Sequence, residues 1–358
     1  GRLAFLIPFT VYKSQAGAGF REFLAKGYWK DEKANSLCRV LRIHDMEALL
    51  PFEGAMNKTS LIVIEKSGKT EFPIPCVMWY NPRSRRIDQE TELEEVKKIT
   101  MRFDLIFTPI EKNKPETPWM EITERAYEKI KKIIGESPWY NAHAGVYTGL
   151  NQIYWIKTNP PLSGQKKKVK QVKQVVEKRL IYPLVRGRGV KRWYVVGEYG
   201  YIIIPHTSNG EVIDESKLKI NFPQTYMYFS RYKDMLIKRT IKPFLGKKPK
   251  TLFYRLDNIG DYTFYPYKVV WKHIAGKTSG KAEFSAAVLE PVTDRFLGQR
   301  TIIPDKLLML IPFKDNEEAH YVCGVLNSSI SQLIVASYVT QICITTHIPR
   351  YIRIPKFN

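Results

Sequence analysis

Several residue patterns that point to common functions are absent from this 358-residue sequence. It contains no CxxC spacing, which argues against zinc sites and thiol redox pairs and favours buried free thiols in a reducing, cytoplasmic compartment. Its four cysteines are Cys38, Cys76, Cys323 and Cys343. No apolar run reaches the roughly 18 residues that a membrane-spanning helix needs, so we expect no membrane partner.

Acidic residues are also scarce, because 35 aspartates and glutamates stand against 57 lysines and arginines. The resulting net charge of +22 implies a polyanionic partner, with nucleic acid favoured over an acidic membrane surface. With 44% apolar and 13% aromatic residues the chain is globular, and its length predicts two domains. The proline-rich stretch 114–118 is the best boundary, so we expect domains at 1–115 and 116–358.

The stretch 180–207, LIYPLVRGRGVKRWYVVGEYGYIIIPHT, places a cationic turn between two apolar runs that we expect to be strands. Its cations are Arg186, Arg188, Lys191 and Arg192. Guanidinium groups suit phosphates and guanine edges, and the two glycines of the turn allow a close backbone approach. A solvated basic hairpin tip is the alternative interpretation.

The first third of the chain has the pattern of an α/β sheet. Residues 3–7 are an apolar run closed by Pro8, which is typical of an interior strand in a mostly parallel sheet. A short helix at 19–26 and strands at 39–43 and 60–64 follow. This order predicts an incomplete doubly wound unit. Elsewhere we expect helices at 92–99 and 123–134, and strands at 77–80, 101–110, 152–156 and 268–272.

A series of ordered motifs resembles those of the TaqI-like and type IIG adenine-N6 DNA methyltransferases. Arg-Gly followed by Lys-Arg-Trp before an apolar strand, at 186–193, is similar to the opening of that family's target recognition domain. Further matching motifs are GVYTGLN at 145–151, LIKR at 236–239, KVVW at 268–271, LNS at 326–328 and the Ile-Pro at 354–355. The resemblance implies the C-terminal part of a Rossmann-like methyltransferase sheet, followed by a mixed α/β target recognition domain.

The resemblance also implies roles for individual residues. Phe52 matches the phenylalanine that packs on the extruded adenine, and a core position is the alternative. Thr148 and Asn151 either cap backbone groups or touch DNA. Lys272, at the basic end of its strand, is a further candidate for DNA binding. On the valine-lined segment 166–176, the lysines face either solvent or phosphate. The phosphate candidates are Lys166, Lys167, Lys168 and Lys170.

Within the cationic turn, Arg188 lies between two glycines, so we expect it to read a guanine in the major groove. We expect Arg186, Lys191 and Arg192 to position the DNA backbone. For Arg186, a salt bridge within the fold is the alternative.

The motifs that transfer a methyl group are missing. A glycine-rich turn after the first strand and an acidic residue ending the second, which would hold S-adenosylmethionine, are both absent. The tripeptide 159–161, Asn-Pro-Pro, is followed by Leu162 instead of an aromatic residue, so we interpret it as a turn. Because the chain begins with Gly1, directly at a predicted strand, we expect it to be part of a longer protein whose cofactor-binding half lies upstream.

Together with the positive charge, the resemblance implies a site-specific DNA adenine-N6 methyltransferase of the restriction–modification type, for which this chain supplies target recognition and the distal half of the catalytic fold. Its partner is double-stranded DNA, its cofactor in the complete enzyme is S-adenosylmethionine, and a fused or separate nuclease is compatible with it. A non-catalytic DNA-binding specificity module of the same fold is the alternative. An RNA-binding protein is suggested by 21 tyrosines and 17 phenylalanines, but no RNP-type aromatic motif or GxxG clamp supports it.

Overall fold

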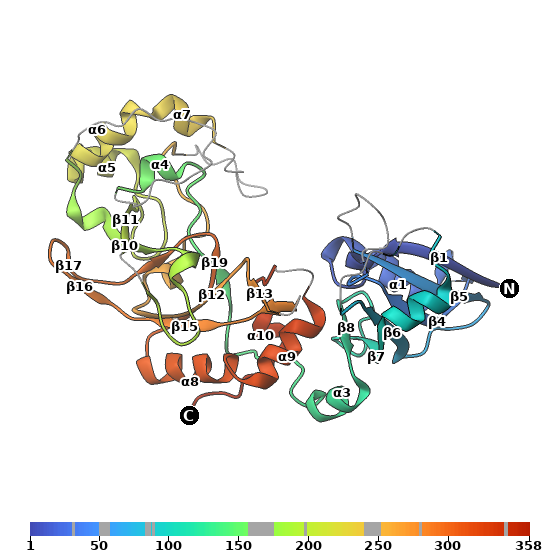
Figure 1. Ribbon diagram of the computed structural model, residues 1–358. Coiled ribbons are helices and arrows are strands. Elements are labelled where there is room, and N and C mark those ends of the chain that lie inside the picture. Colours follow the sequence, from blue (N-terminus) through green and yellow to red (C-terminus); the bar gives the residue numbers. More distant parts are fainter. Residues whose placement is uncertain are drawn as a thin grey trace.

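The protein folds into two lobes joined by a connector (Figure 1). The first lobe is built on a six-stranded sheet, and the second contains two smaller sheets with helices around them. The fold is mixed α/β, as predicted. The computed structural model describes residues 1–30, 33–49, 58–82, 87, 90–156, 175–196, 199–239, 252–278, 281–339 and 343–358.

The first sheet has the strand order β1-β5-β4-β6-β7-β8. Within it, β4 and β6 are parallel, and the other neighbouring pairs are antiparallel. Its strands are β1 (Arg2–Pro8), β4 (Cys38–Asp45), β5 (Thr59–Lys66), β6 (Ile74–Tyr80), β7 (Met101–Pro109) and β8 (Trp119–Ile122). Helix α1 (Ala18–Lys26) links β1 to β4, and β5 returns between them, which confirms the predicted strand, helix, strand and return. The lobe also contains β2 (Tyr28–Lys30), β3 (Lys33–Ser36) and α2 (Leu93–Ile99).

The structure contradicts the prediction that residues 3–7 form an interior strand. Strand β1 pairs on one side only, with β5, and lies at the edge of the described sheet. Leu3 and Leu6 remain 55% and 49% exposed, and Ile7 supplies the buried side chain of this strand. An apolar run reports composition, whereas burial depends on what covers the strand, and the sequence pattern does not contain that information.

The second lobe contains the predicted hairpin around the cationic turn. Strand β10 (Ile181–Val185) pairs antiparallel with β11 (Gly200–Ile203), and β18 (Ile303–Pro304) adds a parallel neighbour to β10. The second sheet of this lobe has the order β15-β12-β19-β9. Its strands are β9 (His143–Ala144), β12 (Tyr267–Lys272), β15 (Ala286–Leu289) and β19 (Leu308–Phe313). A small apolar cluster that includes Val185, Val190 and Leu310 joins the two sheets.

Helices cover both sheets of the second lobe. Residues of α4, α5, α6 and α7 pack against the hairpin sheet, and residues of α8, α9 and α10 pack against the other sheet. The helices are α3 (Glu124–Ile130), α4 (Asn151–Tyr154), α5 (Glu215–Asn221), α6 (Pro223–Arg231), α7 (Lys233–Ile237), α8 (Asn316–Leu326), α9 (Ser329–Tyr338) and α10 (Ile348–Tyr351). Short hairpins are formed by β13 (Gly276–Thr278) with β14 (Lys281–Glu283), and by β16 (Val292–Asp294) with β17 (Gly298–Arg300).

The strand predicted at 152–156 is wrong, because this segment forms helix α4. Its buried residues Ile153 and Tyr154 face the core, and only Trp155 makes an isolated bridge, to Ile202. A five-residue apolar run is too short for its periodicity to separate a strand from a buried helical turn.

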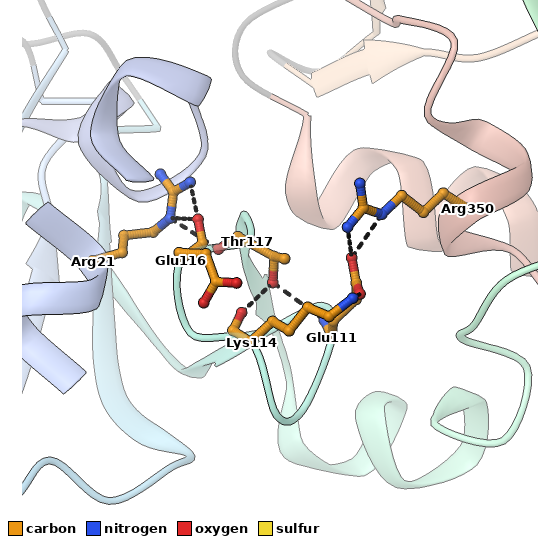
Figure 2. A network of polar contacts seen from close by, with 6 residues as sticks. All are labelled: Arg21, Glu111, Lys114, Glu116, Thr117 and Arg350. Carbon is orange, nitrogen blue, oxygen red and sulfur yellow. Dashed lines mark hydrogen bonds and ion pairs between the residues drawn. The ribbon is translucent and has the colours of Figure 1, made fainter. Parts of the chain in front are cut away.

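The connector consists of residues 110–118, between β7 and β8. Arginines from both lobes bond to it (Figure 2). Fully buried Arg21 of α1 donates hydrogen bonds to the main-chain oxygens of Glu116 and Thr117. From the second lobe, Arg350 forms an ion pair of 2.8 Å with Glu111. Lys114 contacts the other oxygen of the Glu111 carboxylate at 2.6 Å. The connector therefore has fixed contacts with each lobe.

Strand β8 follows the connector and divides its side chains between the lobes. Trp119 belongs to the apolar cluster of the first lobe, and Glu121 forms a buried ion pair there with Lys13 at 3.1 Å. Met120 and Ile122 belong to the large apolar cluster of the second lobe. The boundary between 115 and 116 stays a prediction, and β8, which follows it, is paired with β7 in the first sheet.

A buried carboxyl group lies next to this ion pair. Asp45, at the end of β4, is almost fully buried and accepts a hydrogen bond of 2.7 Å from the Glu47 amide. Burial raises the pKa of Asp45 to about 9, the charge of Glu121 acts in the same direction, and Lys13 opposes it. Asp45 therefore keeps its proton in the folded state at neutral pH.

We expect the Asp45 contribution to stability to fall as the pH rises, and Asp45→Asn to remove that contribution. Because the folded pKa lies above the usual value of 3.8, the folded state binds more protons than the unfolded state from about pH 4 to pH 9. One such proton makes unfolding easier by up to about 1.4 kcal/mol per pH unit. Urea unfolding of both proteins at pH 5, 7 and 9 measures this dependence. The exposed Asp104→Asn variant is the control, and a pH dependence that Asp45→Asn leaves unchanged would contradict the assignment.

Candidate nucleic-acid interface

The cationic turn folds into a short 3-10 helix, η4 (Gly187–Gly189), followed by a tight hairpin. Val190 bridges Val195, and the Lys191 amide donates a hydrogen bond of 3.0 Å to the Tyr194 oxygen. Arg192 and Trp193 therefore form the two-residue tip of the hairpin.

The two glycines of the turn have different structural roles. A Cβ on Gly189 would stand 2.7 Å from the Val196 oxygen, so only glycine fits beside the returning chain. A Cβ on Gly187 would have no neighbour closer than 3.9 Å. The sequence predicted that these glycines let a ligand approach the backbone closely. At Gly189 it is the returning protein chain that makes this close approach.

Two hydrogen bonds fix the tip to the body of the lobe. The Trp193 amide donates to the Ala286 oxygen of β15 at 2.9 Å, and the Arg192 guanidinium donates to the main-chain oxygen of Asn327. Buried Asn327 in turn uses its side-chain amide to bond both the Ala286 amide, at 2.9 Å, and the Ala286 oxygen, at 2.8 Å. The Lys-Arg-Trp and Leu-Asn-Ser motifs therefore meet in space.

Three cations, Arg188, Lys191 and Lys272, lie at this hairpin. Arg188 and Lys191 are exposed, and neither makes an ion pair with any residue that the structure describes. The Lys272 side chain passes beside η4, with its Cγ 4.0 Å from the position of a Cβ on Gly187. Burial lowers the pKa of Lys272, the charge of Lys191 lowers it further, and Glu283 opposes both. An anion between the two lysines would relieve their repulsion.

Arg186 and Arg192 are engaged within the fold. The Arg186 guanidinium lies 5.1 Å from the ring centre of Trp155, which is a cation–π distance. It also lies near Asp305, whose pKa burial raises to about 6 against the opposing hydrogen bond from Leu307 and the charges of Arg186 and Lys306. The DNA-positioning roles of both arginines stay predictions.

Lys306 is a further cation of this surface, and the sequence did not single it out. It lies in the turn after β18, over the Tyr147 ring at 4.4 Å. The oxygen of the next residue, Leu307, is 3.9 Å from the position of a Cβ on Gly187. A single lysine between two strands has no distinctive sequence signal, and only the fold brings it to η4.

Thr148 is engaged within the fold. This residue is 1% exposed, its hydroxyl bonds the Asn151 side chain, and it accepts a hydrogen bond of 3.2 Å from the Leu150 amide. Its main-chain oxygen also accepts a hydrogen bond from Arg239. The GVYTGLN and LIKR motifs therefore meet inside the lobe, and the backbone-capping interpretation holds for Thr148. Half-buried Asn151 directs its side-chain oxygen to the same hydroxyl.

Several predicted site residues lie outside the described residues. They are Phe52, Lys166, Lys167, Lys168 and Lys170, and the same is true of the Asn-Pro-Pro tripeptide at 159–161. In the part of the chain that the structure describes, no three His, Cys, Asp or Glu side chains gather into a metal site. Within those same ranges, no helix is both long and apolar enough to cross a membrane.

Comparison with known proteins finds similar solved structures, among them the following two. No family model and no curated protein matches the chain. The type IIL restriction–modification enzyme MmeI, solved in complex with DNA, shares 10% identity over 98% of this chain and 37% of its own, with a TM-score of 0.48. The type IIG restriction endonuclease BpuSI shares 13% identity over 98% of this chain and 40% of its own, with a TM-score of 0.31. The chain thus spans about two-fifths of each, and at these scores no residue role is transferred.

Proposed function

We propose that the second lobe is the DNA target recognition module of a restriction–modification adenine-N6 methyltransferase. The observation that carries this proposal is the group formed by Arg188 and Lys191 of the turn with Lys272 at the end of β12, beside a hairpin tip that is hydrogen-bonded to β15. Arg188 and Lys191 make no ion pair with any described residue, in a chain of net charge +22. Such a surface binds phosphates and releases their counterions. Arg188, at the exposed face of η4, is the candidate for reading a guanine.

The first lobe is then the distal part of the catalytic sheet. Strand β1, helix α1 and strand β4, with β5 returning between the strands, fit the end of a Rossmann-like methyltransferase sheet. Among the described residues, the second edge of β1 has no partner strand and Leu3 and Leu6 are exposed, so this edge is open to pairing with further strands of a complete enzyme. In that enzyme S-adenosylmethionine would be the methyl donor, and Phe52 the residue that packs on the target adenine.

A non-catalytic DNA-binding specificity module is the second candidate. It is favoured by the absence of a glycine-rich turn and an Asn-Pro-Pro-aromatic motif from the sequence. Adenine methylation by the full-length protein separates the two candidates. Tight DNA binding without any methylation would favour the specificity module.

The DNA interface is tested by neutralising its three cations together. We expect Arg188→Gln, Lys191→Gln and Lys272→Gln in one variant to weaken binding to all duplexes. The slope of log affinity against log salt should flatten by about 0.9 for each phosphate that the variant no longer neutralises. Fluorescence anisotropy with a labelled duplex, between roughly 50 and 200 mM salt, measures both effects.

The matched control removes the same charge elsewhere. Lys97, Lys131 and Lys219 each pair with a glutamate on their own helix, so their replacement by glutamine changes net charge equally. We expect this control to leave the salt slope almost unchanged. Identical slopes for the two triple variants would place the DNA-binding surface away from the hairpin.

A further inference from the structure

Trp193, at the tip of the hairpin, has a backbone conformation that bulky residues rarely adopt. Its φ of +79° is in the left-handed region, which is unfavourable for a residue with a side chain. Such a conformation persists only where the surroundings enforce it. Here two hydrogen bonds do so, one from the Trp193 amide to the Ala286 oxygen and one from the Arg192 guanidinium to the Asn327 oxygen. Both bonds hold the tip in one orientation.

The indole side chain of Trp193 is not part of an apolar core in the described chain. Trp193 is 52% exposed and belongs to none of the apolar clusters of the described chain. In contrast, Trp119 and Trp271 are fully buried. Among the described residues the only ring contact of Trp193 is the Arg192 guanidinium, 5.6 Å from the ring centre. The adjacent Tyr194 is 57% exposed. The tip therefore presents aromatic surface to solvent from an anchored backbone.

The charges around the tip define the chemistry of its ligand. Lys191 and Arg192 directly precede Trp193 in the sequence, and the charge of Lys191 also lowers the pKa of Lys272 at the end of β12. A ligand suited to this surface combines negative charge with a planar apolar face. A nucleic acid with an unstacked base has both, and a base on an aromatic ring contributes about 1–3 kcal/mol.

We propose that Trp193 is a stacking site for an unpaired nucleobase, next to the duplex held by Lys191 and Lys272. This inference rests on the proposed DNA-binding function, and it assigns an unpaired base as the ligand of Trp193. Because both anchors already fix the tip, the base binds at little cost in conformational freedom. Trp193 then recognises a distorted or opened base pair independently of the phosphate contacts.

The test compares two duplexes of equal length and charge. One is fully paired, and the other has an abasic site that leaves a single base without a partner. We expect the native chain to bind the second duplex about 5- to 150-fold more tightly, which is the range that stacking free energies give. Trp193→Gly should remove this preference and leave affinity for the paired duplex within about twofold. Glycine tolerates the left-handed backbone, so this variant keeps the hairpin geometry.

Two further variants complete the experiment. Trp193→Phe should keep part of the preference, because a smaller ring still stacks. Trp139→Ala removes a tryptophan that is 55% exposed in another part of the lobe, and it should change neither affinity. A native chain that binds no DNA would refute the proposed function itself. A chain that binds both duplexes equally, or a Trp193→Gly variant that keeps the preference, would overturn the stacking site alone.

Discussion

Replacing Arg21 with methionine should destabilise the protein by about 3–5 kcal/mol, because four main-chain oxygens would lose their hydrogen-bond donor. The Arg21 guanidinium is fully buried and donates to the oxygens of Val11, Ser14, Glu116 and Thr117. Burial lowers its pKa to about 10, and the nearby Tyr351 and Glu116 oppose this shift. The side chain is therefore still charged at neutral pH, where charge-assisted hydrogen bonds are the stronger ones.

Lysine should not rescue this position. A lysine ammonium group cannot reach all four main-chain oxygens that the planar guanidinium group of Arg21 contacts. We therefore expect Arg21→Lys to lose most of the same stability. Arg350→Ala is the matched control, since Arg350 is half-exposed where it pairs with Glu111. An exposed ion pair contributes at most about 1 kcal/mol. Urea unfolding gives all three values, and an Arg21→Met destabilisation no larger than that of Arg350→Ala would contradict the role assigned to Arg21.

Asn327→Ala should cost about 2–4 kcal/mol and loosen the hairpin tip. The side-chain amide of Asn327 pairs with both main-chain groups of fully buried Ala286, so its removal leaves the Ala286 amide without that acceptor. The Ala286 oxygen also accepts from the Trp193 amide, so disorder at β15 passes directly to the tip. Hydrogen exchange at the Trp193 amide should therefore accelerate in the variant.

Exposed Asn221, at the end of α5, provides the control for this substitution. Asn221→Ala should change stability by no more than about 0.5 kcal/mol and leave the exchange of Trp193 unaltered. If Asn327→Ala lost stability without faster exchange at Trp193, the tip would be held by contacts other than the Ala286 oxygen.

The sequence predicted those elements whose signals are local. The hairpin of β10 and β11 follows from two apolar runs around a glycine-containing turn, and the strand predicted at 268–272 is present as β12. The prediction that residues 3–7 form a buried interior strand was wrong, because the exposure of β1 depends on which strands lie beside it. At 152–156, the short apolar run suited a helix as well as a strand.

The candidate site was only partly predictable for the same reason. The cations of the turn are evident in the sequence, but the proximity of Lys191 to Lys272 depends on how β12 lies against the hairpin. The motif around Thr148 left backbone capping and DNA contact open, whereas the fold buries this residue and bonds its main-chain oxygen to Arg239. Some motifs of the resemblance are thus positions where distant segments bond to one another. Their presence in order reports the fold more directly than the function.

Strand β8 contributes side chains to the cores of both lobes. The alternation of these side chains determines which residues pack in each lobe. Successive strand residues point to opposite faces, so Trp119 and Glu121 serve one lobe while Met120 and Ile122 serve the other. Inserting or deleting a single residue in β8 would exchange these faces and turn a charged carboxylate toward the apolar core of the second lobe. A second lobe transplanted from a related protein would therefore have to keep the register of β8.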